Sequence, residues 1–428
     1  MHYNDKEQPE GDRMTLWLST GLIFTFAAIA LILYRWWDMQ CIGVTPVRTL
    51  TFIAILFTSG LDVGLIMFPL TEFGGYGNVS ENPEYAFANP LAIEFGFWAF
   101  LIWGFYFLTC FYFAIIEPRV KFFEIPAVKL INNVVIIGTC AFTAYLLLVN
   151  LPWYLPMLGD GESVVPAFYA IVFLSIALAV YSSSKVKYIR ILSVGSSVLF
   201  ITLIAGMWLR AFAMGKGSPA DFFGTMGLLG EYFTNLHRFA LPINDYHEFY
   251  LFWWFSWSIM IGQFTARFVS GIKTWKLLIA MLVVPSVAIA VWFSVLFHYH
   301  AEGLKIAAFT NLAMISVGVL MVVNSLDSLI RLYTDNLNLT ARRLGRLNYV
   351  ALNLVVMVGL TMLFQLDFLR IQWVGALVIA LYFACFAYIL ANKRAEVAAI
   401  KPSPETRILV FHRIETAGRA PISGWAAG

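Results

Sequence analysis

Aromatic residues are concentrated in one long apolar segment, where Trp253, Trp254 and Trp257 stand within a few residues of one another. A second group stands on another apolar segment and comprises Trp98, Trp103 and Tyr106. The face of an aromatic ring attracts a cation through the ring quadrupole. Two such groups facing each other would form a cage for an organic cation, so the pattern predicts a binding site for a quaternary ammonium compound.

The spacing of these rings argues for a site, although bulky packing is the alternative. On a continuous helix with about 100° per residue, Trp98, Trp103 and Tyr106 share one face. The chain also contains 38 phenylalanines, so aromatic residues could simply fill the interior. Tryptophan, however, carries an N–H group that needs a partner when buried. Its recurrence on two apolar segments, away from their ends, favours a binding role.

The composition indicates which environment surrounds these apolar segments. Hydrophobic residues make up 60% of the 428 residues and charged residues only 12%, which predicts an all-α polytopic membrane protein. A membrane span needs about 20 apolar residues. We expect eleven spans, at about 15–36, 48–70, 91–116, 128–151, 164–182, 189–214, 246–268, 275–297, 306–330, 347–367 and 371–392. Little chain remains for a soluble catalytic domain, so we expect no enzymatic activity.

The basic residues between the spans predict the orientation. Lysine and arginine are enriched on one side, for example at Arg119, Lys187 and Arg343, and the opposite side carries acids such as Glu81 and Glu84. Because basic loops stay in the cytoplasm, the C-terminus is expected there and the N-terminus outside. The four cysteines show no paired spacing, so neither a disulfide nor a metal site is expected. No basic cluster suggests nucleic-acid binding.

The second span is interrupted by Gly60, Asp62 and Gly64. Glycine weakens a helix, and a carboxylate at the centre of a bilayer costs about 2.5–3.5 kcal/mol on insertion scales. Such a segment is tolerated where it lines a cavity, and broken helices expose backbone groups to substrates and ions in transporters. The alternative is a close contact between helices through small residues. The presence of Asp62 argues against that alternative.

Several motifs together resemble the betaine/choline/carnitine transporter family. They are Phe249–Trp257 followed by Gly262–Arg267, Trp292–Ser294, the Trp98–Tyr106 spacing, Val323–Ser328, and Gly60 and Gly64 followed by Glu72. The resemblance covers about residues 15–392. It implies two inverted five-helix repeats of the leucine-transporter type, alternating access, a homotrimer and a bacterial inner-membrane location.

The resemblance also implies a division of the chain. The parts are an external N-terminus at 1–14, an additional span and cytoplasmic loop at 15–47, a first repeat at 48–214, an external amphipathic helix or loop at 215–245, a second repeat at 246–392 and a cytoplasmic tail at 393–428. By position, Trp98, Trp103, Tyr106 and Trp254 would form the cage. Trp253 and Trp257 would line the path, and backbone groups near Gly60 and Gly64 would meet a substrate carboxylate or hydroxyl.

The sequence departs from this family in three ways. We expect the usual first span to be absent, and Asn324 and Ser325 stand where a sodium-coupled member has a Thr-Ser pair. Asp62 replaces a glycine. The expected coupling ion is therefore H⁺ at Asp62 or Na⁺ near Asn324 and Ser325, with uncoupled exchange as a further possibility, and no other cofactor is expected.

Three classes of function follow. The leading interpretation is import of a cationic or zwitterionic compound such as choline, glycine betaine or carnitine, or a sulfonium analogue. The alternatives are a sensor or channel that binds such compounds on a transporter scaffold, and a membrane enzyme acting on lipid headgroups. The enzyme would need a cluster of acidic, histidine or cysteine residues, which the sequence pattern does not indicate.

Overall fold

The computed structural model describes residues 8–61, 64–184 and 187–401. Asp62 lies outside these residues. The first half of the chain contains α1 (Gln8–Trp36), β1 (Gln40–Ile42), α2 (Thr49–Ser59), α3 (Gly64–Gly77), η1 (Pro83–Tyr85), α4 (Pro90–Trp98), α5 (Leu101–Phe111), η2 (Tyr112–Ile116), α6 (Glu117–Val120), η3 (Phe122–Glu124), α7 (Pro126–Tyr154), η4 (Pro156–Leu158), α8 (Pro166–Ser183) and α9 (Lys187–Ala213).

The second half contains α10 (Pro219–Gly227), α11 (Gly230–Thr234), η5 (Leu236–Ala240), α12 (Asp245–Ala266), β2 (Ser270–Lys273), α13 (Thr274–Ala301), α14 (Ala308–Asn336), α15 (Ala341–Leu344), α16 (Arg346–Gln365), α17 (Ile371–Tyr388), η6 (Ile389–Lys393) and α18 (Arg394–Ala398). The segment 215–245, expected as an external amphipathic helix or loop, thus holds two short helices and a 3₁₀ turn.

The described helices are long and apolar, as the composition predicts. Nine of them meet the length and hydropathy of a membrane span, and the pair α2 and α3 forms a tenth if its bent halves are one span. The helix α12 does not belong to this set, although its 22 residues match the expected span at 246–268. Its many tryptophans and polar residues lower its hydropathy. The chain is a multi-pass membrane protein.

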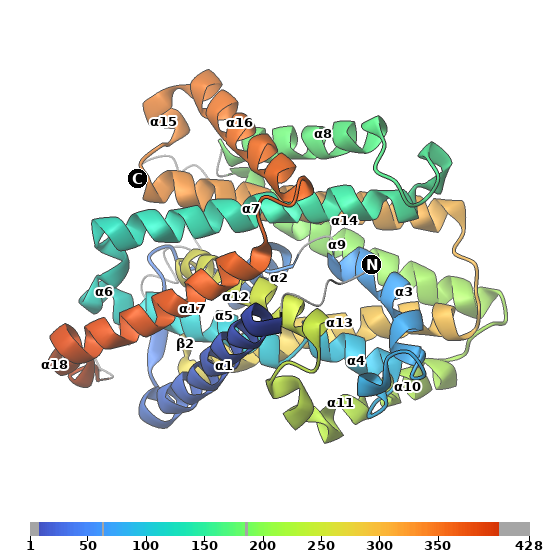
Figure 1. The fold of residues 1–428 in the computed structure, drawn as a ribbon, viewed down its shortest axis with the longest axis horizontal. Helices are drawn as coiled ribbons and strands as arrows, with labels where there is room; N and C mark the ends of the chain where they lie inside the picture. Colours follow the sequence, from blue (N-terminus) through green and yellow to red (C-terminus); the bar gives the residue numbers. More distant parts are fainter. Residues whose placement is uncertain (1–7, 62–63, 185–186, 402–428) are drawn as a thin grey trace.

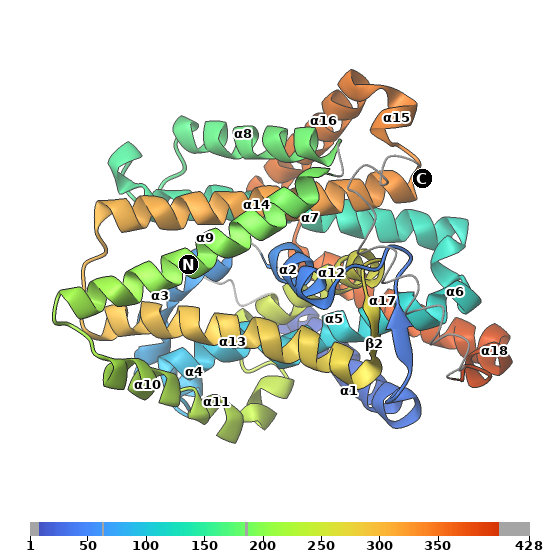
Figure 2. The same ribbon diagram turned by 180° about the vertical axis from the view of Figure 1, so that it is seen from behind.

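The aromatic-rich helix α12 lies at the centre of the bundle. It packs against α5 and α17 most extensively, and also against α7, α14 and α2 (Figures 1 and 2). Nearly all of its side chains are buried, including Trp253, Trp254 and Trp257. The helix α1 lies at the periphery against α17 and α5. The predicted cage residues on α12 are therefore shielded from lipid by neighbouring helices.

The bundle has two chemically different ends. The elements α6, α15 and α18 lie at the left end of Figure 1, and α3 and α10 lie toward the right end. The left-hand elements carry basic residues, including Arg119, Arg342 and Arg394. The right-hand end includes the acidic residues Glu72 and Asp221. The basic residues of α15 agree with the charge bias, but α6 and α18 also carry the acids Glu117 and Glu396, so the orientation stays a prediction.

The interruption of the second span is confirmed. The helix α2 ends at Ser59 with Gly60 as its C-cap, α3 begins at Gly64, and the two helices are bent by 55°. A helix end leaves carbonyl groups without intrahelical partners. The bend therefore turns backbone oxygens of Thr58, Gly60 and Leu61 toward neighbouring helices.

The expected span at 91–116 is present as Pro90–Val120, but it is not one continuous helix. The chain forms α4 and α5, with a break at Ala99 and Phe100, and Phe100 has a positive φ of 47°. The freed N–H of Phe100 donates to the Ser286 hydroxyl on α13 at 2.9 Å. Trp98, Trp103 and Tyr106 would share one helix face only on an unbroken helix. Their proximity therefore has another cause. Neither glycine nor proline occurs at the break, so the sequence does not indicate it.

A small sheet that the sequence did not predict joins two connections. The strands β1 and β2 pair in antiparallel fashion, with Cys41 opposite Ile272. Gly43, the residue after β1, lies close to the C-terminal end of α12. An added Cβ would stand 2.1 Å from the carbonyl oxygen of Arg267. Burial raises the pKa of the Cys41 thiol to about 12, so this cysteine stays protonated and serves as a packing residue.

Candidate functional site

Five of the six predicted aromatic site residues form one chain of ring contacts. The ring centroid of Trp98 lies 5.5 Å from that of Trp253 and 5.3 Å from that of Trp254, both edge to face. Tyr106 joins the chain 6.1 Å from Trp254, and Trp103 follows 5.2 Å from Tyr106. All of these rings are almost completely buried. We call these five residues the ring cluster. Trp257 is buried one turn further along α12.

The break between α4 and α5 explains how the ring cluster is held. The last carbonyl groups of α4 have no intrahelical partners. The indole N–H of Trp254 donates to the carbonyl of Phe97 at 2.8 Å, and that of Trp103 donates to the carbonyl of Trp98 at 3.0 Å. Two predicted site tryptophans thus cap a broken helix. The indole N–H groups of Trp253 and Trp257 have no acceptor within the described ranges, and that of Trp98 lies near the Glu94 carboxyl without hydrogen-bond geometry.

The interrupted span reaches the ring cluster through Gly60. An added Cβ on Gly60 would lie 3.3 Å from Tyr106 and 3.4 Å from Trp103, and the Tyr106 hydroxyl donates to the Gly60 carbonyl at 3.3 Å. A larger side chain at position 60 would therefore press on both rings. Gly64 begins α3 on the other side of the bend. The structure thus brings Gly60 next to the rings, as expected.

The predicted ion-coupling residues on α14 contact the same bend. The amide of Asn324 donates to the Thr58 carbonyl at 2.8 Å, and the hydroxyl of Ser325 donates to the Leu61 carbonyl at 2.8 Å. The other amide atom of Asn324, Oδ1, accepts from Ser193 on α9 at 3.3 Å. Oxygen atoms from α2, α14 and α9 therefore gather here, within the fully buried surroundings of Asn324 and Ser325.

A pair of carboxyl groups beside the ring cluster was not predicted as part of the site. Glu72 on α3 and Glu94 on α4 contact each other, and Glu94 is fully buried one turn before Trp98. The sequence suggests only that these residues lie near span ends. The spacing of Tyr246 and Tyr250 on one face of α12 is visible in the sequence, but nothing there shows that they face Glu72.

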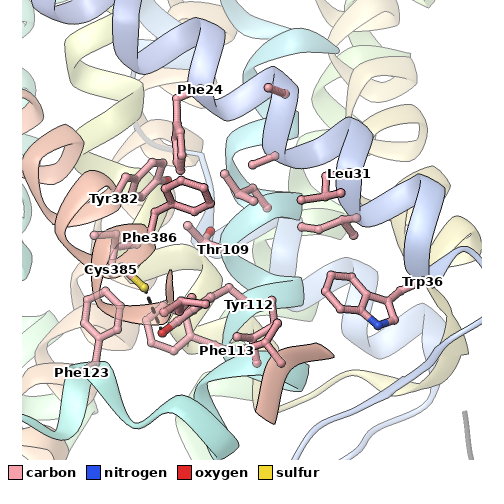
Figure 3. Close-up of a pocket in the computed structure, with 18 residues that line it drawn as sticks. Phe24, Leu31, Trp36, Thr109, Tyr112, Phe113, Phe123, Tyr382, Cys385 and Phe386 are labelled. Carbon is pink, nitrogen blue, oxygen red and sulfur yellow. Dashed lines mark hydrogen bonds between the residues drawn. The ribbon is translucent and has the colours of Figure 1, made fainter. Parts of the chain in front are cut away.

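An apolar cavity of about 300 Å³ lies elsewhere in the bundle, between α1, α5, η2 and α17. Figure 3 shows Phe24, Tyr382 and Phe386 at one side of this cavity and Trp36 at the other. Its polar groups are largely engaged, since the Cys385 thiol donates to the Tyr112 hydroxyl at 3.2 Å. The cavity shares no lining residue with the ring cluster, so it is a separate feature that opens beside the peripheral helix α1.

Comparison with known proteins identifies similar sequences. An uncharacterized transporter of Haemophilus influenzae is 23% identical over 287 residues, which cover 58% of this chain and 41% of that protein. The glycine betaine transporter OpuD of Bacillus subtilis is 31% identical over 110 residues, or 23% of this chain and 21% of the relative. The chain is similar to transporters.

An uncharacterized transporter of Mycobacterium tuberculosis is 33% identical over 76 residues, which are 16% of this chain and 13% of the relative. No family model matches the chain. The chain spans less than half the length of the relatives it matches. The resemblance to the betaine/choline/carnitine transporters is therefore confirmed as a similarity of low identity and partial coverage. The names of the relatives favour transport over enzymatic activity.

Proposed function

We propose that this chain is a secondary active transporter that imports a quaternary ammonium or sulfonium compound, such as choline, glycine betaine or carnitine, by alternating access. The observation that carries the proposal is the ring cluster packed against the bend between α2 and α3. Ring faces supply sites for a methylated cation, and the indole N–H group of Trp253 could donate to the carboxylate of a zwitterion.

The substrate would enter the ring cluster by separating its members. A cation binds within about 6 Å of a ring centroid, in front of the ring face. The rings of Trp98 and Trp254 are 5.3 Å apart and in contact, which leaves no room for a trimethylammonium group between them. Binding would move α4 relative to α12, and the break at Ala99 and Phe100 is a position at which α4 could pivot relative to α5.

The helix pairing supports a division into two inverted repeats, at 48–214 and 246–392. The third helix of the first repeat is α7, which packs against α14, α16 and α17. The third helix of the second repeat is α14, which packs against α7, α8 and α9. Each helix thus contacts its counterpart and the last two helices of the other repeat. Exchange of two repeats by a pseudo-two-fold axis would produce this relation.

The orientation in the membrane and the assembly of the chain also belong to the proposed function. The basic end of the bundle would face the cytoplasm of a bacterium together with the C-terminus, and the end containing Glu72 would face outward. The functional assembly would be a homotrimer within the lipid bilayer. An enzymatic role is not proposed, because the relatives are named as transporters.

Counterflow in proteoliposomes tests the proposal. Vesicles loaded with unlabelled choline, glycine betaine or carnitine should accumulate the labelled compound transiently, because only a carrier exchanges substrate faster than it permits net flux. Binding without counterflow would support the alternative function, a sensor for onium compounds. Conduction that does not saturate would support a channel. Imposing Na⁺ and pH gradients separately would then identify the coupling ion.

We expect Ser325→Ala to impair sodium coupling if Na⁺ is the coupling ion. The Ser325 hydroxyl, the Thr58 and Leu61 carbonyls and the Asn324 amide oxygen would supply hard oxygen ligands. Loss of one ligand costs about 1–3 kcal/mol, so the Na⁺ concentration for half-maximal uptake should rise about tenfold. Ser316→Ala, on an exposed part of the same helix, is the matched control. An unchanged Na⁺ dependence in Ser325→Ala would exclude this site.

A further inference from the structure

The carboxyl pair of Glu72 and Glu94 has an unequal set of hydrogen-bond partners. Glu72 accepts hydroxyl groups from Tyr76 and Tyr246, and the Tyr250 hydroxyl lies 3.0 Å from each of its oxygens. Glu94 is fully buried, and neither of its oxygens has a donor within the described ranges when its carboxyl group is ionised. The described ion pairs include neither glutamate. The three tyrosine hydroxyls therefore bind Glu72. The nearest donors to Glu94, the Tyr76 hydroxyl and the Trp98 indole N–H, do not reach its oxygens with hydrogen-bond geometry.

This inequality indicates where a proton resides. Two ionised carboxylates are acceptors only and cannot hydrogen-bond to each other. Two like charges in contact are unfavourable, and an uncompensated charge on the fully buried Glu94 is costly. A proton on Glu94 supplies an O–H that donates to Glu72, which satisfies the contact between the two side chains. One shared proton thus accounts for the geometry of both residues.

None of the neighbouring tyrosines competes with the pair as the group that exchanges a proton. The tyrosines that face it are Tyr76, Tyr246 and Tyr250 in hydrogen-bond contact, with Tyr85 and Tyr154 farther away. Tyrosine hydroxyls are ordinarily neutral at pH 7. Burial further raises the pKa of Tyr85, in the loop before α4, to about 12.

Two other ionisable groups lie on neighbouring elements. His247 on α12 stacks on Phe97, with ring centroids 4.4 Å apart, and its Nδ1 accepts the Ile243 N–H. Glu84 in η1 accepts from Asn244. Neither group hydrogen-bonds to Glu72 or Glu94 within the described residues, but the charge of each acts on the pair through space.

The pair is linked physically to the ring cluster. The ring of Tyr250, whose hydroxyl binds Glu72, lies 5.6 Å from the ring of Trp98. Glu94 precedes Trp98 by one helical turn on α4. Tyr246, the other α12 donor to Glu72, is 41% exposed and connects the pair to the surface. A positive charge among the rings would therefore act on the proton at short range, and water could receive that proton.

We propose that Glu72 and Glu94 form a proton-binding site whose proton is released when an organic cation binds in the ring cluster. The inference rests on the proposed function and deepens it by naming a site at which a proton competes with the cation. The bound cation repels the proton, and the proton in turn weakens binding of the cation by the same factor. Affinity for choline should consequently increase with pH, because deprotonation leaves a negative charge beside the rings.

The test measures choline binding to the purified full chain as a function of pH. From about pH 5.5 to about pH 8, the affinity of the wild-type protein should increase about fivefold or more. Glu94→Gln should remove this dependence and hold the affinity near its acid value, because the amide N–H donates to Glu72 as the protonated acid does. Glu248→Gln, at a carboxylate bound to Thr15 instead, is the matched control and should respond as wild type.

Infrared spectroscopy supplies a measurement that does not depend on substrate. A band from a protonated carboxylic acid should be present in the wild-type protein at neutral pH and decrease in Glu94→Gln. A band of unchanged intensity in that variant overturns the inference. A pH response that survives in Glu94→Gln, or that is lost only in Asp62→Asn, His247→Gln or Glu84→Gln, overturns it as well. Absence of choline, glycine betaine and carnitine counterflow in the wild-type protein would refute the proposed function, and the infrared result would still decide whether the pair holds a proton.

Discussion

Replacing Trp254 with leucine is expected to weaken binding of choline about ten- to thirtyfold while the protein still folds. The ring of Trp254 contacts Trp98, Trp253 and Tyr106, which makes it the central member of the ring cluster. A desolvated ring face contributes up to about 2 kcal/mol to the binding of a cation, and each 1.4 kcal/mol corresponds to about a tenfold change in Kd. Scintillation proximity or calorimetric titration of the purified protein measures this change.

Two further variants separate the ring from its hydrogen bond. Trp254→Phe keeps an aromatic face but removes the indole N–H that donates to the Phe97 carbonyl. It should weaken binding less than Trp254→Leu does. Trp373→Leu removes a tryptophan that is 52% exposed at the start of α17 and should bind as wild type. If Trp254→Leu folds, as judged by a monodisperse elution profile, and binds choline with unchanged affinity, the assignment of the ring cluster as the cage is wrong.

The sequence predicts those features whose causes are local. Long apolar runs specify the helices, and Gly60 and Gly64 mark the bend because glycine weakens a helix wherever it stands. The membership of the ring cluster was inferred from motif spacing, and the contacts among Trp98, Trp253 and Trp254 agree with it. In these cases the residues that determine the feature are neighbours in the chain or belong to a specific motif.

Features that depend on distant residues could not be predicted. The break at Ala99 and Phe100 has no glycine or proline, and it is stabilised by Ser286 on α13 and by the indole of Trp254 on α12. The contact of Glu72 with Glu94 joins α3 to α4, and the tyrosines that bind Glu72 come from α3 and α12. A single sequence does not reveal which helix faces meet. The consequence is that the proximity of these aromatic residues was anticipated, but the acid pair beside them was not.

The close approach of α17 to α12 leaves no room for a side chain at Gly375. Gly375 on α17 lies against the backbone of Phe252, the residue before Trp253. A Cβ added at Gly375 would stand 2.3 Å from the Phe252 carbonyl oxygen and 2.9 Å from its carbonyl carbon. Real Cβ atoms do not approach a neighbour this closely. Because the obstacle is backbone of a central helix, no rotamer change relieves the clash.

We expect Gly375→Ala to destabilise the protein by about 3 kcal/mol or more, near or above the upper end of the usual range for overpacking. The helix α17 would have to move away from α12, and the movement would disturb the position of Trp253 and thus reduce choline binding too. Heating the detergent-solubilised protein and measuring the fraction that remains monodisperse gives the apparent melting temperature.

Gly359→Ala, on α16 with no described atom within 4 Å of the added Cβ, is the matched control. Alanine favours a helix over glycine by up to about 1 kcal/mol, so this control should be as stable as wild type or slightly more stable. Equal melting temperatures for Gly375→Ala and wild type would mean that α17 does not pack against α12 at this distance, and the support that α17 gives to the ring cluster would have to come from elsewhere.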